Sequence, residues 1–524
     1  MNASPSTTTP GPRQTWSGQW GFIVSAIGSA VGLGNIWRFP GVAYENGGGA
    51  FLIPYLVALL TAGIPILFLD YAIGQRFRGS APLAFRRIAR WAESFGWFQV
   101  MICFFIAIYY AAILAWAASY FVFSFTGAWG EDPAGFFVGS YLKVGDPGFS
   151  TTPVWGVLVP LVLIWVAAII VLALRLDKGL ERANIIFIPL LVVAFGALVV
   201  RSVFLPGASI GLNALFTPDF SKLSDPSVWI AAYSQIFFSL SIAFGIMITY
   251  SSYRRRKSNQ TTPGLVVAFA NSSFEVLAGI GVFSVLGFMA DQSFGGSFAT
   301  LVKEARISGP MLSFVTFPKV ISQMPGSWVF GALFFGSLLM AGFTSMVSIT
   351  EVISSAFQDK FGFSRAKASV ATGMPMAVLS VVLFATTTGL TSLDVVDKFA
   401  NEIGIVFSAV AMSVIVLWIK NKGSELAYHL SSLSTFKVGR TWRVLVTAIC
   451  PLVLGYMLVN CVVGILTEGY EGYPTWYLGT AGWGAVAVMV AGSFALAAVR
   501  WRSDPEGFVP WPAYPPAGEK GGIR

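Results

Sequence analysis

Apolar residues in this 524-residue chain lie in long uninterrupted blocks, and no other feature restricts its fold so strongly. The stretches 51–69, 154–174 and 185–200 are examples. Runs of about 17–25 apolar residues match the hydrocarbon thickness of a bilayer. Only 11% of the residues are charged, less than half of the roughly 25% that is usual in soluble domains. The sequence therefore predicts an all-α integral membrane protein.

Twelve segments are predicted to cross the membrane. They lie near 18–44, 50–76, 95–128, 154–174, 183–203, 227–253, 264–290, 327–359, 366–387, 393–419, 442–465 and 477–499. With the N-terminus inside, Lys and Arg cluster in the inner loops near 76–90, 175–182, 254–257 and 420–443, and the outer loops carry few. This positive-inside pattern predicts a multi-pass protein of the cell membrane with both termini in the cytoplasm. It also accounts for the net charge of +9 without any nucleic-acid partner.

The chain divides into five predicted parts. Residues 1–15 form a cytoplasmic tail, 16–420 a ten-helix core, 421–441 a cytoplasmic linker, 442–500 helices 11 and 12, and 501–524 a second cytoplasmic tail. From residue 504 onward this second tail is rich in Pro and Gly, so we expect it to be disordered.

Two of the predicted spans carry sequences that weaken a helix near their middle. Residues 28–35 of span 1 contain three glycines, and residues 238–245 of span 6 contain two serines. Non-helical backbone inside a bilayer must line protein or a water-filled cavity. Broken helices five spans apart indicate a 5+5 inverted repeat with a binding site near the midplane. Close helix packing through glycine is the alternative.

Several functional classes find no support in the sequence. His429 is the only histidine and is expected in a polar loop, while Cys103, Cys450 and Cys461 fall in apolar blocks. The sequence therefore lacks the residues for a histidine-based enzyme site or a Cys/His metal cluster. It also lacks a phosphate-binding Gly-x-x-x-x-Gly-Lys-Ser/Thr loop, which disfavours ATP-driven pumping.

Two runs near the N-terminus are distinctive. They are Ala30-Val-Gly-Leu-Gly-Asn-Ile-Trp-Arg-Phe-Pro40 and Glu45-Asn-Gly-Gly-Gly-Ala-Phe-Leu-Ile-Pro-Tyr55. They closely resemble the neurotransmitter:sodium symporter family, and similar patterns recur up to about residue 420. Helices 11 and 12 match by position only. The resemblance implies a transporter in which spans 1 and 6 are broken, and the bacterial amino acid branch fits best.

The resemblance implies two sodium sites and no organic cofactor. Sodium is a hard cation suited to oxygen ligands, and unwound backbone supplies carbonyl oxygens. The first site would use the Ala30 carbonyl and the side chains of Asn35, Asn271 and Ser239, with the substrate carboxylate. The second would use the carbonyls of Gly28, Val31 and Ala341 and the hydroxyls of Thr344 and Ser345. These hydroxyls would otherwise bond to their own helix.

A substrate site is implied beside these ions. The amides around Leu33 and Gly34, with the Tyr110 hydroxyl, would hold a carboxylate. The carbonyls of Ala30, Phe238 and Ser239, with the Ser241 side chain, would hold an ammonium group, and Ile106, Phe238, Phe244, Ser345 and Ile349 would form the pocket wall. In any membrane helix, an aromatic or isoleucine residue alone is ordinarily packing.

Two positions bear on selectivity. Gly32 stands where monoamine-transporting members carry an aspartate, so the substrate is expected to bring its own carboxylate. Glu275 stands where chloride-dependent members carry a serine, so its carboxylate is expected to replace chloride. Asp70 stands where some relatives use a glutamate to brace the broken span 6.

Gate residues are implied in the same way. Arg38 with Asp397 would close the outer path above Phe238 and Tyr110. Arg13 with Asp359, assisted by Trp16 and Tyr253, would close the inner path. Weak ion pairs suit a gate, since solvated pairs contribute only ~0–1 kcal/mol. The sequence assigns no role to Glu351, Lys398 or Glu402; Glu402 would either couple protons or satisfy a polar neighbour.

The sequence as a whole thus predicts import of neutral, mostly apolar L-amino acids with sodium by alternating access, without chloride. Leucine, methionine, alanine and aromatic substrates all stay open. A sensor that keeps the transporter fold is the alternative, but the short tail after residue 500 lacks the folded domain that such a sensor would use. A homodimer or a small accessory subunit also stays open.

Overall fold

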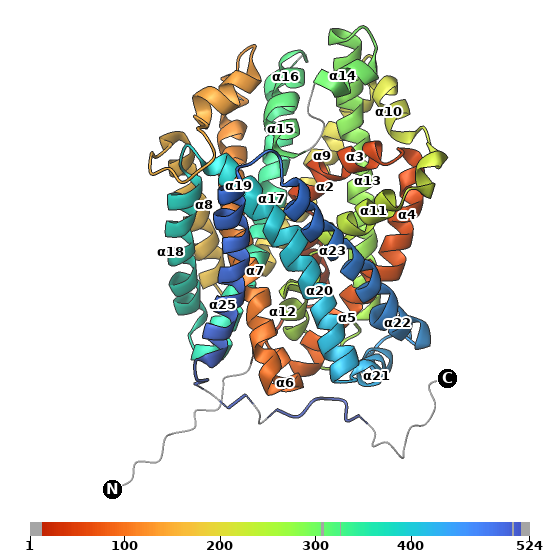
Figure 1. Cartoon of the computed structure of the whole chain (residues 1–524), viewed down its shortest axis with the longest axis vertical. Coiled ribbons are helices and arrows are strands. Elements are labelled where there is room, and N and C mark those ends of the chain that lie inside the picture. Colours follow the sequence, from red (N-terminus) through yellow and green to blue (C-terminus); the bar gives the residue numbers. More distant parts are fainter. Residues whose placement is uncertain (1–12, 305–308, 325, 503, 506–507, 515–524) are drawn as a thin grey trace.

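The computed structural model describes residues 13–304, 309–324, 326–502, 504–505 and 508–514. Its regular elements in these ranges are helices, and no β-strand occurs among them (Figure 1). The helices stand side by side as one bundle. The all-α prediction is therefore confirmed for the described residues.

Ten helical spans in the described ranges are long and apolar enough to cross a membrane. They are Gly49–Phe77, with α4 (Leu52–Ala58) and α5 (Ile64–Phe77); Arg90–Phe123, with α7 (Glu93–Phe123); α8 (Trp155–Ala173); α9 (Leu180–Val203); α13 (Thr261–Ser293); α17 (Ser327–Phe361); α18 (Arg365–Phe384); Gly389–Ile419, with α19 (Gly389–Lys398) and α20 (Val406–Ser413); Arg440–Glu468, with α22 (Arg440–Val444) and α23 (Cys450–Glu468); and Thr475–Ala498, with α24 (Thr475–Tyr477) and α25 (Gly484–Ala498). Each of the ten overlaps one predicted segment.

The first predicted span is broken where its glycines lie. Helix α1 (Gln19–Ala30) ends before Val31 and Gly32, and the chain continues as α2 (Leu33–Trp37) and α3 (Phe39–Glu45). The two halves, Gln19–Ala30 and Leu33–Glu45, are bent by 52° and together pass as one membrane span. Counted in this way, the described residues contain eleven candidate spans.

Predicted span 6 is also interrupted. Helices α11 (Pro226–Ser239) and α12 (Ile246–Ser252) are separated by residues 240–245. Ser241, Ala243 and Gly245 have φ values of +53°, +66° and +93°, a left-handed backbone that non-glycine residues seldom adopt. At about 1.5 Å per residue neither helix alone spans a bilayer of about 30 Å.

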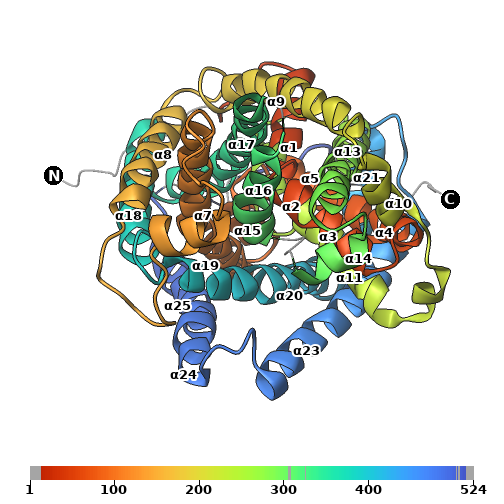
Figure 2. The ribbon, with the colours of Figure 1, turned by 90° about the horizontal axis from the view of Figure 1, so that it is seen from above.

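The broken helices occupy the middle of the bundle. Seen from above, α1, α2 and α5 lie inside a ring that includes α7, α9, α13 and α17, while α23 and α24 project outside it (Figure 2). The spans Arg90–Phe123 and Thr261–Ser293 are 78% buried, whereas Thr475–Ala498 is 22% buried. The last two spans are therefore peripheral, and the central cavity is built by earlier ones.

We call the end of the bundle that carries α6 (Ala81–Ile88) and α21 (Gly423–Leu433) the terminal end, because the described ends of the chain pack there (Figure 1). The other end, with α10 (Ala208–Phe216), α14 (Phe298–Glu304), α15 (Gly309–Met311) and α16 (Phe317–Ser322), is the opposite end. Positive-inside clusters 76–90 and 420–443 fall at the terminal end.

The prediction of a polar loop around His429 is wrong. The segment 421–441 contains helix α21, and His429 lies fully buried with its Nε2 atom 3.1 Å from Gln75 Oε1. Leu426, His429 and Leu430 recur at helical spacing and are all buried. Burial and, to a smaller extent, nearby Arg76 lower the pKa of His429 to about 3, so the ring is neutral.

The expectation of a disordered second tail also needs correction in its described part. Arg87 Nε donates to Pro505 O at 3.1 Å, and the Arg87 guanidinium lies 4.1 Å from the centre of the Phe508 ring. Arg76 Nη1 donates to Pro512 O at 3.0 Å. Arginine–aromatic contacts of this kind hold the tail against the terminal end. Residues 515–524 lie outside the described ranges.

Candidate substrate and sodium site

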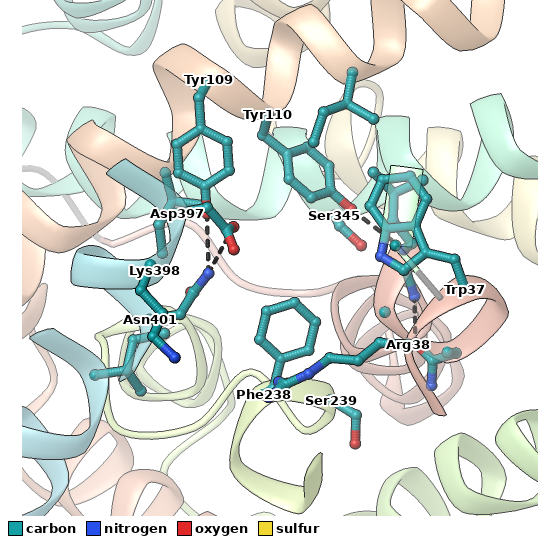
Figure 3. A pocket seen from close by; sticks show the side chains of 18 of the residues that line it. Trp37, Arg38, Tyr109, Tyr110, Phe238, Ser239, Ser345, Asp397, Lys398 and Asn401 are labelled. Carbon is teal, nitrogen blue, oxygen red and sulfur yellow. Dashed lines mark hydrogen bonds between the residues drawn. The ribbon is translucent and has the colours of Figure 1, made fainter. Parts of the chain in front are cut away.

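The two helix breaks meet at one cavity of about 340 Å³. Ser241, in the second break, donates from Oγ to Ser29 O at the end of α1, over 2.8 Å. The cavity is lined by every residue predicted to bind substrate: Ala30, Leu33, Gly34, Ile106, Tyr110, Phe238, Ser239, Ser241, Phe244, Ser345 and Ile349. Helices α7 and α17 complete its wall. Figure 3 shows Tyr110, Phe238 and Ser345 facing the same space.

Polar side chains from two helices bind the backbone of the second break. Asp70 Oδ2 on α5 accepts from Ala243 N at 2.8 Å, and Gln99 Nε2 on α7 donates to Ala243 O at 2.9 Å. Cys103 Sγ lies 3.1 Å from Phe244 O. Buried backbone groups outside a helix need such partners. Asp70 therefore reaches the unwound segment although it is one methylene shorter than glutamate.

The side chains predicted for the first sodium site form a buried chain. Asn35 Nδ2 donates to Asn271 Oδ1 at 2.9 Å, and Asn271 Nδ2 donates to Ser239 Oγ at 3.0 Å. Gly32 N donates to Asn35 Oδ1 at 2.8 Å. Together with Ala30 these residues lie at the first break, and all are buried. The side chains thus gather oxygen atoms from α2, α11 and α13 in a small region.

Glu275 lies fully buried next to this chain on α13. Gln235 Nε2 donates to Glu275 Oε1 at 2.7 Å, and Tyr55 OH donates to Oε2. The Tyr55 hydroxyl also lies 2.9 Å from Ser272 Oγ. No Lys or Arg in the described part of the chain forms an ion pair with this carboxyl group. A cation bound at the neighbouring oxygens would supply the opposite charge.

The residues predicted for the second sodium site also come together. Ser345 Oγ on α17 lies 3.3 Å from Gly28 O, 3.4 Å from Val31 O and 3.1 Å from Ala341 O. Thr344 Oγ1 lies 2.9 Å from Ala341 O and 3.1 Å from Met340 O, within its own helix. With Ser29 O, also at 3.3 Å, four carbonyl oxygens from α1, its break and α17 thus surround one hydroxyl.

Gly32 occupies the tightest point between the first break and α17. A methyl group at this position would lie 2.9 Å from Ser345 Oγ and 3.2 Å from Tyr110 OH. Leu33 N donates to the same Tyr110 hydroxyl at 3.5 Å. Any side chain at position 32 would therefore project at the Tyr110 hydroxyl, where the amide of Leu33 also points.

Toward the opposite end, the cavity is lined by polar residues of α19 and the following turn. Asn401 Nδ2 donates to Asp397 Oδ1 at 2.8 Å and to Tyr109 OH at 3.1 Å. Tyr109 and Asn401 were not predicted from the sequence as site residues. Asn401 follows Asp397 by four residues, one helical turn, and this spacing is the signal that was available.

Arg38 and Asp397 do not form an ion pair, although both lie in the described ranges and line the cavity. Arg38 Nη2 donates to Ser234 Oγ at 3.1 Å, and its guanidinium lies 4.7 Å from the centre of the Phe238 ring. Figure 3 shows Arg38 beside Phe238, while Asp397 faces Tyr109 and Asn401. The predicted outer gate is therefore unpaired in this conformation.

The predicted inner gate is closed at the terminal end. Arg13 Nη1 donates to both Asp359 carboxylate oxygens, at 2.7 and 2.8 Å. Its guanidinium lies 4.8 Å from the centre of the Tyr253 ring. Trp16 Nε1 donates to Tyr250 O at 2.8 Å. Burial opposes the charge on Arg13, but Asp359, Tyr253 and Glu351 together outweigh this effect and raise the pKa of the guanidinium.

Two ion pairs involve Glu351, Lys398 and Glu402, the charged residues to which the sequence assigned no role. Arg365 donates to both oxygens of Glu351, at 2.9 and 2.7 Å, and Tyr253 OH donates to Glu351 at 2.6 Å. Lys398 Nζ lies 2.6 Å from Glu402 Oε2, one turn along the same helical segment. Glu402 thus satisfies a polar neighbour, the second of the two alternatives.

Comparison with known proteins identifies the family. The profile of the sodium:neurotransmitter symporter family matches residues 13–134 and 130–502. The chain belongs to this family. It is therefore a sodium-dependent membrane transporter, as the motifs at residues 30–55 indicate, and the family is one of transporters and not of enzymes.

Individual relatives agree with this assignment. The transporter is 40% identical over 468 residues to an uncharacterised sodium-dependent transporter of Methanocaldococcus jannaschii, covering 89% of this chain and 94% of that one. It is 30% identical to a sodium- and chloride-dependent taurine transporter of Canis lupus familiaris, covering 90% and 82%. The crystal structure of MhsT in complex with L-phenylalanine matches with a TM-score of 0.73 and 32% identity, over 86% of this chain and all of that one.

Proposed function

We propose that this transporter imports neutral, mostly apolar L-amino acids together with sodium ions bound at two sites. The observation that carries the proposal is the cavity between the breaks, where the Leu33 amide and the Tyr110 hydroxyl lie 3.5 Å apart in the wall. A backbone N–H and a hydroxyl can both donate to a carboxylate. The L-phenylalanine in the complex of the structural neighbour MhsT supports a substrate of this kind.

The shape around Gly32 supports an amino acid over a monoamine. A monoamine lacks a carboxylate, so its ammonium group needs an acidic partner in the protein. Position 32 has no side chain, and an added methyl would already approach Ser345 and Tyr110. Gly32 therefore offers no acidic partner for an amine, and the substrate itself would supply the carboxylate, close to the first sodium ion.

Transport would proceed by alternating access. In this conformation Arg13 and Asp359 are paired and Arg38 and Asp397 are separate, which fits a state closed toward the terminal end. We assign the terminal end to the cytoplasm, since the basic clusters lie there. The sodium gradient would supply the work, because one charge crossing 100 mV is worth ~2.3 kcal/mol.

We further propose that transport is independent of chloride. Glu275 lies beside the first sodium site, is bonded by Gln235 and Tyr55, and would be negatively charged when sodium is bound. A fixed carboxylate at this place makes a second anion unnecessary and would repel it. The taurine transporter among the relatives is chloride-dependent by name, so the proposal rests on Glu275 and not on membership of the family.

Binding of amino acids to the purified transporter tests the main proposal. Leucine, methionine, alanine, phenylalanine and tryptophan would be offered in Na⁺ and in K⁺ at equal ionic strength. We expect saturable binding of one or a few of them in Na⁺ only. If a folded preparation binds none of them in Na⁺, the amino acid proposal fails.

Replacing chloride by gluconate in an uptake assay tests the second proposal. Uptake by the parent protein should not change, whereas Glu275→Ser should lose uptake in gluconate and regain part of it in chloride. Uptake by the parent that collapses in gluconate would contradict the proposed role of Glu275. The Glu275→Gln variant, which keeps the size of the side chain, controls for lost packing.

A further inference from the structure

The short loop between the last two spans binds a carboxylate of α19. Tyr470 OH donates to Asp394 Oδ1 at 3.1 Å, and Tyr473 OH donates to Asp394 Oδ2 at 3.0 Å. The Lys398 ammonium pairs with Glu402 at 2.6 Å, and it lies 5.1 Å from the centre of the Tyr470 ring. Both oxygen atoms of Asp394 are therefore held by neutral phenol groups.

This loop and α19 belong to one packed unit. A hydrophobic cluster separate from the main core joins span 10 to the last two spans through Val395, Phe399, Ile403, Ile465, Tyr477, Leu478 and Ala481. Tyr470 and Tyr473 pack against this cluster. The Tyr477 hydroxyl also lies 2.9 Å from Ser392 Oγ on α19. We therefore expect the two phenols to stay with α19 when the broken first span moves against it.

Two carboxylates of α19 lie where one arginine has to find its partner. Asp394 and Asp397 are three residues apart, which places them on neighbouring faces and about 4.5 Å apart along the helix axis. Both line the central cavity, as does Arg38. In this conformation Arg38 donates to Ser234, and Asp397 faces Asn401 and Tyr109 (Figure 3). Without its phenols, Asp394 would compete with Asp397 for Arg38 when the outer path closes.

We propose that Tyr470 and Tyr473 are positioning residues of the outer gate: by occupying Asp394, they leave Arg38 to pair with Asp397. The inference rests on the proposed function, in which Arg38 and Asp397 close the outer path. A hydrogen bond to a charged group contributes more to stability than a solvated ion pair does. Asp394 therefore keeps its two phenols while Arg38 moves. The last two spans, although peripheral, thus decide which carboxylate the gate uses.

Combined substitutions separate this role from simple packing. The double tyrosine variant, Tyr470→Phe with Tyr473→Phe, removes both hydroxyls and keeps both rings in the hydrophobic cluster. Asp397→Asn removes the gate carboxylate, and Asp394→Asn removes the competing one. Tyr477→Phe is the matched control, because it removes a hydroxyl of the same cluster that bonds Ser392 and no carboxylate.

A cysteine in place of Val42 reports whether the outer path is closed. Val42 is half-buried, lines the cavity and lies one helical turn beyond Arg38. An impermeant thiol reagent is applied to intact cells in Na⁺ alone, and in Na⁺ with the amino acid of the panel that the parent binds most tightly. The ratio of the two labelling rates measures closure by substrate. Protein that retains Val42 gives the background from the native cysteines.

The effect of Asp397→Asn on this ratio is the decisive measurement. In the parent it should lower the ratio about three- to fivefold, the upper end for a partly exposed ion pair, and Asp394→Asn alone should have little effect. In the double tyrosine variant the effect of Asp397→Asn should fall below about 1.5-fold, because the freed Asp394 pairs with Arg38 instead. Adding Asp394→Asn should restore the full effect, and Tyr477→Phe should leave it unchanged.

An equal effect of Asp397→Asn in the parent and in the double tyrosine variant would overturn the proposal, since the phenols would then only pack. So would an effect that Asp394→Asn does not restore, or that Tyr477→Phe also removes. If the double tyrosine variant does not fold, Tyr470→Phe alone frees one oxygen of Asp394 and must still weaken the effect. A parent in which Asp397→Asn has no effect lacks the outer gate, whereas a parent that binds no amino acid in Na⁺ refutes the proposed function, so these failures are distinct.

Discussion

Replacing Arg13 with glutamine should open the terminal end of this transporter. The Arg13 side chain joins the segment before α1 to α17 and α12. It donates to Asp359 at 2.7 and 2.8 Å, and to Ser252 and Ser355 at 3.1 Å each. It also stacks on Tyr253. Glutamine is too short and uncharged, so all of these contacts are lost or weakened together.

The free energy lost in this variant depends on how deeply the Arg13–Asp359 ion pair is buried. Exposed ion pairs contribute ~0–1 kcal/mol, and breaking a fully buried pair costs about 3–5 kcal/mol. The Arg13 and Asp359 side chains are each 15% exposed, and Asp359 keeps a hydrogen bond from Ser80 N at 2.7 Å. We therefore expect Arg13→Gln to destabilise the state closed at the terminal end by about 2 kcal/mol. The equilibrium between the closed and open states would then shift roughly 30-fold toward the open state. An open population of about 1% would rise to about a quarter.

A cysteine at position 25 of α1 would report the opening. Ser25 is fully buried, and its hydroxyl has no partner among the described residues. A membrane-impermeant thiol reagent applied from the terminal end should label Ser25→Cys about 20- to 30-fold faster in the Arg13→Gln background, in proportion to the open population. The parent without Ser25→Cys corrects for the three native cysteines.

Arg175→Gln is the matched control for lost positive charge. Arg175 pairs with Asp177 at 3.3 Å, and its side chain is 72% exposed, so its removal should leave the labelling rate unchanged. An unchanged rate in Arg13→Gln, with the protein folded and binding amino acid, would refute the assignment of Arg13 to the gate. So would an equal acceleration in both variants.

Three further predictions concern other parts of the molecule. Gly32→Asp places a carboxylate against that of the substrate, and like charges in contact cost several kcal/mol. The affinity for amino acids in Na⁺ should therefore fall by at least about 100-fold. An affinity equal to that of the parent would contradict the proposed substrate site. Asp70→Ala removes the acceptor for the Ala243 amide and should destabilise the protein by about 1–3 kcal/mol, seen as a lower melting temperature, while Asp70→Asn keeps an acceptor and should lose less. Burial, aided by Arg76, lowers the pKa of His429 to about 3. The unfolded chain takes up a proton below its pKa of about 6.5 while the folded protein does not, so stability should fall by about 1.4 kcal/mol per pH unit from about pH 6.5 to 3. His429→Gln should abolish this part of the acid sensitivity, and an equal loss in both proteins between pH 7 and 5 would contradict the burial of the ring.

Local patterns in the sequence were enough for ten of the twelve predicted membrane spans and, counted as a bent pair, for an eleventh. Hydrophobic length sets which segments can cross a bilayer, and this is a property of neighbouring residues. The glycines at 28, 32 and 34 likewise indicated the first break, which lies at Val31 and Gly32. Motif resemblance then named the eleven residues of the substrate site, all of which line one cavity.

The tertiary structure alone decided which residues far apart in the chain contact one another. Arg365 pairs with Glu351, His429 is buried against Gln75, and the described tail packs on Arg87. Whether a polar residue is exposed depends on which helix covers it, and no periodicity within one segment contains that information. Whether Arg38 pairs with Asp397 was also decided by the tertiary structure, because the distance between the two side chains depends on the conformation of the whole bundle.

The contact between α1 and α9 shows the division most clearly. The sequence determined that Glu181 and Asn184 lie three residues apart on one face of a span, because helical geometry fixes which residues share a face. It also determined that Gly21 and Gly28 lack side chains. Only the packing of α1 on α9 decided that each oxygen meets one of those glycines, since two helices can pack in many registers and the buried volume of the whole bundle selects one.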